Sequence, residues 1–236
     1  MRDHPSGFIR TIPRPVLAAL IAVSSLGIPS GSQATDVQAP PHEILEGPLT
    51  RPLPVAHRTS TAATISFGRF TSIQVNVDPT GANILGDAAN EPSIAVDPTN
   101  PSRMAIGWRQ FDTVLSGFRE AGYGFSTNGG QSWSTGKIEP GVFRSDPVLS
   151  YDAQGKFYYM SAHLDLTKSE ITTQLFTSTN QGMTWGPAVN AFGGDKEWFT
   201  VDRTNGMGHD QLYESWSLNG HSSEEFSRSI DGGQSF

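Results

Sequence analysis

The stretch Ser126-Thr127-Asn128-Gly129-Gly130-Gln131-Ser132-Trp133 decides the fold, because its pattern returns twice along the chain. The copies occupy residues 178–185 and 229–236, which begin 52 and 51 residues further on. All three share the pattern Ser-x-Asn/Asp-x-Gly-x-Ser/Thr-Trp/Phe. A repeat of about 50 residues indicates one small structural unit that is copied along the chain.

A second element repeats in phase with the first. It is a short apolar run that ends in Asp, at residues 91–97, 146–152 and 197–202, with the third copy one residue shorter. A turn and another apolar or aromatic run follow each copy, and a third run precedes each eight-residue motif. The expected second runs are 104–108, 157–162 and 211–216, and the clearest third runs are 122–126 and 171–178.

Each unit therefore reads as strand A, turn, strand B, loop, strand C, the motif as a turn, and strand D. Four short strands that recur every 50 residues or so are typical of β-propeller blades. In the motif, the Asn or Asp side chain is expected to accept hydrogen bonds from turn amides, and Gly supplies a positive φ. One such side chain per copy is too few oxygen ligands for calcium, so we expect no metal and no other cofactor. The prediction is an all-β propeller.

The eight-residue pattern resembles the Asp-box, or bacterial neuraminidase repeat, of sialidases and of other propellers such as xyloglucanases and sortilin-type receptors. Together with residues 91–98 and 107–112, it makes residues 63–236 similar to secreted bacterial sialidase-like proteins. The resemblance implies four-stranded blades of the sialidase type, an extracellular glycan or glycoconjugate as partner, and a glycosidase or carbohydrate-binding activity. Catalytic and non-catalytic propellers both carry this motif.

The rest of the chain predicts an exported protein. Residues 1–34 have a basic start, a 13-residue mostly apolar run at 16–28, and small residues that suit cleavage after Ala34, all typical of a signal peptide. Residues 35–62 are rich in Pro and read as a linker. We expect a secreted or periplasmic protein whose mature chain has no membrane span. We also expect a partial propeller of about three to four blades out of six, with the remaining blades on a longer chain.

Composition narrows the function classes. The 236 residues carry a formal charge of −7 and include no Cys, so disulfides cannot stabilise the fold. No basic stripe appears, which argues against a nucleic-acid partner.

Strand direction predicts where a ligand would bind. Strands in a blade alternate, so the starts of strands A and the ends of strands B share one face, opposite the Asp-boxes. Acidic side chains there could act as acid and base in glycosidic cleavage, and Arg offers a planar fork to a ligand carboxylate. The candidate catalytic residues are Glu91, Asp112 and Asp146; the candidate ligand-binding residues are Arg109, Arg144, Glu197 and Trp216.

Two functions remain open at this point. One is a glycoside hydrolase of the exo-sialidase type that acts on extracellular glycans, and the other is a non-catalytic propeller that binds a glycan or a protein. The sialidases share an Arg-Ile-Pro motif in the first blade, whereas this chain has Asn90-Glu91-Pro92-Ser93 at the matching place. Repeated carboxylates such as Glu91 and Asp146 could also serve the fold by bonding loop amides in every blade.

Overall fold

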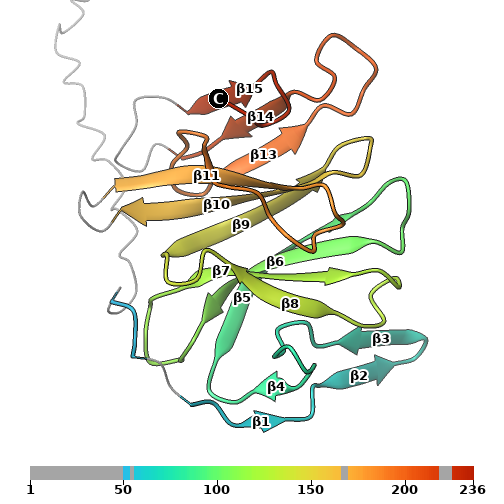
Figure 1. Ribbon diagram of the computed structural model, residues 1–236, viewed down its shortest axis with the longest axis vertical. Helices are drawn as coiled ribbons and strands as arrows, with labels where there is room; N and C mark the ends of the chain where they lie inside the picture. The colour runs from blue at the N-terminus through green and yellow to red at the C-terminus, as the bar shows by residue number, and fades with distance from the viewer. Residues whose placement is uncertain (1–49, 54–55, 166–169, 218–224) are drawn as a thin grey trace, which may run out of the picture. The chain divides into compact units, whose positions relative to one another are not determined.

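The computed structural model describes residues 50–53, 56–165, 170–217 and 225–236. Within these ranges every regular element is a β-strand, drawn as an arrow in Figure 1. The strands pair antiparallel in every sheet. The predicted signal peptide lies outside the described residues. No helix in the described part of the chain has the length and hydropathy needed to cross a bilayer.

The first sheet is a four-stranded meander in the order β5-β6-β7-β8. The loops 97–103, 112–119 and 127–133 join these strands, and each strand pairs with its neighbour in sequence. The predicted strands match these elements, although β5, β6 and β7 each extend the predicted run. The bounds are β5 (Ala88–Val96), β6 (Met104–Phe111), β7 (Glu120–Ser126) and β8 (Ser134–Ile138).

The second sheet repeats this order, and the third repeats the first three positions. The second runs β9-β10-β11-β12, and the third runs β13-β14-β15. The four-strand repeat predicted from the sequence is therefore present, whereas closure of the sheets into a propeller is not observed. The bounds are β9 (Arg144–Tyr151), β10 (Phe157–Asp165), β11 (Glu170–Ser178), β12 (Val189–Asn190), β13 (Trp198–Val201), β14 (Leu212–Ser215) and β15 (Phe226–Ser229).

Two small two-stranded sheets precede the repeats. One is the hairpin of β2 (Thr64–Phe67) and β3 (Phe70–Ile73), and the other pairs β1 (Thr59–Ser60) with β4 (Asn83–Ile84). The segment between β3 and β4 contacts the first sheet. Its Val77 carbonyl accepts a hydrogen bond of 2.7 Å from the hydroxyl of Thr135 in β8.

Each eight-residue motif forms the turn after the third strand of its sheet. In the second motif the Ser178 hydroxyl donates to Asn180 Oδ1 (2.9 Å) and accepts from the Gly182 amide (2.9 Å). Asn180 Oδ1 also accepts from the Thr184 amide (3.0 Å), and the first and third motifs repeat these bonds. The predicted role of the motif as a hydrogen-bonded turn is confirmed.

The core lies between successive sheets. Ala95 and Ala105 of the first sheet pack with Leu149, Phe157, Tyr159 and Phe176 of the second. On the other side of the second sheet, Val148, Tyr158, Met160 and Leu175 pack with Phe199, Val201 and Leu212 of the third. Strand β9 contacts both β5 and β13, so the first strands of successive sheets are neighbours.

Candidate functional site

The starts of the first strands of all three sheets surround one cavity of about 310 Å³. Sequence reasoning placed a ligand at this end of the strands, and the structure brings residues of three separate repeats together there. The lining residues are Glu91, Pro92 and Ser93 beside Asp146, Pro147, Val148, Lys196, Glu197 and Trp198.

An unusual backbone turn recurs at each of these strand starts. Glu91, Asp146 and Lys196 have φ values of 49°, 47° and 57°, in the left-handed region that non-glycine residues seldom adopt. The pairing registers of β5 with β6 and of β9 with β10 shift at this point. Irregularities of this kind re-aim side chains and are over-represented next to active sites.

The backbone corrects the sequence alignment of the third repeat. Lys196, which precedes Asp202 by six residues, shares its positive φ with Glu91 and Asp146, which precede Asp97 and Asp152 by six. Lys196 is therefore their structural counterpart, and Glu197 takes the place of a proline. Counting back from the terminal Asp of each run would have revealed this in the sequence.

Arg109 links the first two repeats across the cavity rim. Its Nη2 lies 2.8 Å from Glu91 Oε1, and its Nη1 lies 3.8 Å from Asp146 Oδ1. Its Nε donates to Asn90 Oδ1 at 2.8 Å. Lys196 Nζ approaches Asp146 Oδ2 at 3.6 Å from the third repeat. Two carboxyl groups and two cations thus form one mixed cluster.

The environment moves the pKa values of the two carboxyl groups in opposite directions. Burial and the negative charge of Asp146 raise the pKa of Glu91, and Arg109 only partly offsets them. Burial would also raise the pKa of Asp146, but the Ser145 hydroxyl and the charges of Lys196 and Arg109 outweigh it and lower that pKa. Asp146 therefore keeps its charge more readily, and Glu91 takes up a proton more readily.

Glu197 adds a buried carboxyl group to the same cavity. Its side chain is 2% exposed, and neither oxygen has a hydrogen-bond partner of good geometry among the described residues. Burial, together with the charges of Asp146 and Glu214, raises its pKa well above the ordinary value. Glu197 therefore holds its proton to a higher pH than an ordinary glutamate does.

Arg144 and Trp216, both predicted to contact ligand, are buried away from the cavity lining. The guanidinium of Arg144 is 1% exposed, lies 4.7 Å from the ring centroid of Phe176, and donates to Gln174 and Glu139. Trp216 is 7% exposed and packs beside Gly194. Arg144 and Trp216 therefore contribute to packing within and beside the second and third sheets.

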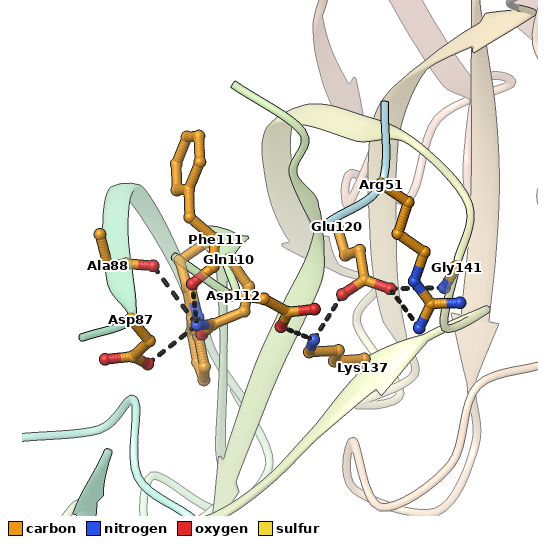
Figure 2. A network of polar contacts seen from close by, with 10 residues as sticks. Arg51, Asp87, Ala88, Gln110, Phe111, Asp112, Glu120, Lys137 and Gly141 are labelled. Carbon is orange, nitrogen blue, oxygen red and sulfur yellow. Dashed lines mark hydrogen bonds and ion pairs between the residues drawn. The ribbon is translucent and has the colours of Figure 1, made fainter. Parts of the chain in front are cut away.

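Asp112 belongs to a separate network that includes the start of β7 and the end of β8, just past the end of β6, and that Figure 2 draws. It pairs with Lys137, which also binds the buried carboxylate of Glu120. Glu120 in turn accepts a hydrogen bond from the Gly141 amide and lies 3.9 Å from Arg51. The structure does not bring Asp112 to the cavity where Glu91 and Asp146 meet. No local sequence pattern predicts the pairing of Asp112 with Lys137.

No cluster of three or more His, Cys, Asp or Glu in the described ranges is arranged to hold a metal ion. Comparison with known proteins adds no assignment, since no protein-family model matches this sequence and no curated protein is significantly similar to it.

Proposed function

We propose that this chain is an extracellular, sialidase-like propeller protein that binds a hydroxyl-rich glycan at the cavity where its three repeats begin. The observation that carries the proposal is the convergence of Glu91, Asp146 and Lys196, one from each repeat, with Arg109 at the same rim. Carboxylates accept hydrogen bonds from sugar hydroxyls, and cations donate to them. Ligand cavities typically combine an apolar lining with a few polar groups of this kind.

The charge balance favours a neutral glycan over an acidic one. Both cations at the rim already face carboxylates, Arg109 through Glu91 and Asp146, and Lys196 through Asp146. The carboxylate of an acidic sugar would have to displace one of these partners, and Glu91 and Asp146 would repel it. Sugar hydroxyls can instead join the existing hydrogen bonds without disrupting the charge pairs.

Binding without cleavage is favoured over hydrolysis because Arg109 engages both carboxyl groups at the rim. Its guanidinium lies 2.8 Å from Glu91 and 3.8 Å from Asp146, so each carboxyl would have to leave this cation before it could act on a glycosidic bond. Asp112, the third candidate catalytic residue, pairs with Lys137 away from the cavity lining. Hydrolysis remains the second candidate because a raised pKa for Glu91 and a lowered pKa for Asp146 suit a general acid and a charged partner.

Two arginines near opposite ends of β6 provide a matched test. Arg109 stands at the cavity end of β6, and Arg103 stands before its other end, where it pairs with Asp97 at 3.5 Å. Binding of the full chain to an immobilised panel of neutral and sialylated glycans would be compared for the wild type, Arg109→Ala and Arg103→Ala. We expect neutral glycans to bind, Arg109→Ala to weaken binding at least tenfold, and Arg103→Ala to leave it unchanged.

Two outcomes would contradict the proposal: no binding to any glycan in the panel, or equal losses in the two variants. Release of fluorophore from a fluorogenic sialoside, abolished by Glu91→Gln, would instead support the hydrolase.

A further inference from the structure

One kind of interface occurs twice within the chain. Each sheet has a leading face, turned toward the next repeat, and a trailing face, turned toward the preceding one. Between the first and second sheets, the trailing face of the second sheet contributes Leu149 and Tyr159. Between the second and third sheets, the leading face of the second sheet contributes Val148, Tyr158 and Leu175. Leading and trailing faces are therefore complementary surfaces in this fold.

The leading face of the third sheet carries apolar residues at the same register positions. Counting from the Asp that ends each first strand, Trp198 takes the place of Val148. Tyr213 pairs with Thr200 as Tyr158 pairs with Ser150, and Phe226 pairs with Ser215 as Leu175 pairs with Met160. Trp198, Tyr213 and Phe226 are thus the counterparts of Val148, Tyr158 and Leu175.

These counterparts differ sharply in exposure. Val148 and Leu175 are 4% and 0% exposed, whereas Trp198 and Phe226 are 67% and 56% exposed. The Tyr213 ring stacks on Phe226 with 6.3 Å between centroids, so the surface is preformed. Strand β15 is the outermost strand of its sheet among the described residues. An aromatic face of this kind marks an interaction surface.

The trailing face of the first sheet shows the matching exposure. Ile94 is the counterpart of Leu149 and Phe199, which are 7% and 3% exposed, yet Ile94 itself is 53% exposed. A cavity of about 180 Å³, lined in part by Ile106 and Trp108, opens on this sheet. Val75 packs over Gly124 of β7, so the uncovered part of the face is at β5 and β6.

We propose that a second copy of this chain, in place of the blades of a longer chain that the sequence leads us to expect, covers these surfaces, with the leading face of the third sheet of one copy on the trailing face of the first sheet of the other. The argument for a second copy is continuity, because each molecule carries both halves of an interface that it already forms twice internally. Two such contacts related by a twofold axis give a closed dimer that joins six repeats.

The test uses the full chain and sedimentation velocity over a range of concentrations. Phe226→Asp disables the leading face, Ile94→Asp disables the trailing face, and Met207→Asp is a matched control at a fully exposed loop position. We expect the wild type and Met207→Asp to sediment as dimers. Each face variant alone should weaken the dimer at least tenfold while keeping the wild-type circular dichroism, because both substituted side chains are exposed.

Mixing the two face variants provides the decisive measurement. An equimolar mixture restores one intact contact, between Phe226 of the Ile94→Asp chain and Ile94 of the Phe226→Asp chain. Particles with one copy of each variant should therefore reappear. A monomeric wild type, an Ile94→Asp dimer as tight as the wild type, or no recovery in the mixture would overturn the proposal.

Discussion

At the scale of single residues, the eight-residue motif holds the repeats together as well as turning the chain. Gly182 of the second motif lies against the first sheet, where an added Cβ would meet Ala105 at 3.1 Å and Phe125 at 3.3 Å. An added Cβ at Gly233 of the third motif would come closer still to Leu175 of the second sheet, at 2.6 Å. Each of these glycines thus combines a positive φ with close contact to the preceding repeat.

Gly182→Ala should therefore destabilise the fold more than Gly129→Ala. Both glycines have a positive φ, 80° and 71°, so each alanine costs about 1 kcal/mol in backbone strain. An alanine at Gly129 meets nothing within 4 Å, whereas one at Gly182 adds overpacking worth about 1–3 kcal/mol. Urea unfolding of the two variants beside the wild type measures the difference. Equal losses would show that the contact with the first sheet is not tight.

At the scale of elements, Glu214 joins the second and third sheets through a buried set of hydrogen bonds. The hydroxyl of Thr173 in β11 donates to its Oε1 at 2.5 Å, and Ser227 of β15 lies 2.9 Å from its Oε2. The Ser227 hydroxyl also lies 2.8 Å from the Ala191 carbonyl. Because Ser227 has a single proton to donate, both contacts are satisfied together when Glu214 itself is protonated and donates to Ser227.

Stability should consequently fall as the pH rises through neutrality. Burial raises the pKa of Glu214 to about 7, against hydrogen bonds from Thr173 and Ser227 that lower it. The folded state binds the proton more tightly, so its contribution is complete below the ordinary pKa of 4.5 and is lost as the pH passes about 7. The loss between pH 5 and 8 should reach about 2.5 kcal/mol.

Urea unfolding at pH 5 and pH 8 checks this with Glu214→Gln, which keeps a donor toward Ser227. The substitution should reduce the loss of stability on going to pH 8 without abolishing it, because the raised pKa of Glu197 acts with the same sign. An unchanged pH dependence in the variant would mean that Glu214 does not titrate near neutrality.

Sequence alone predicted the strand order because the turns that separate the strands have local chemistry. The Ser, Asn and Gly of the motif at 126–133 bond to one another within eight residues, so their pattern specifies a turn wherever it recurs. Where a side chain lies, by contrast, depends on its contacts with other strands and sheets. Arg144 and Asp146 both lie near the start of β9, yet Arg144 is buried over Phe176 whereas Asp146 lines the cavity. Only the packed fold reveals this difference.

At the scale of the whole described chain, the site and the association surface depend on the same arrangement. Adjacent first strands bring Glu91, Asp146 and Lys196 to one cavity, and the same packing leaves Ile94 at one end of the series and Phe226 at the other. The central claim is therefore that successive repeats pack side by side in register.

Zero-length carbodiimide cross-linking tests that packing most directly. The reagent joins an amine to a carboxylate only where the two already meet, and Lys196 Nζ lies 3.6 Å from Asp146 Oδ2 of the preceding repeat. Lys137 and Asp112, which pair within the first sheet, provide the internal control. Mass spectrometry should find a Lys196–Asp146 amide alongside the Lys137–Asp112 amide. A Lys137–Asp112 amide without a Lys196–Asp146 amide would contradict the account.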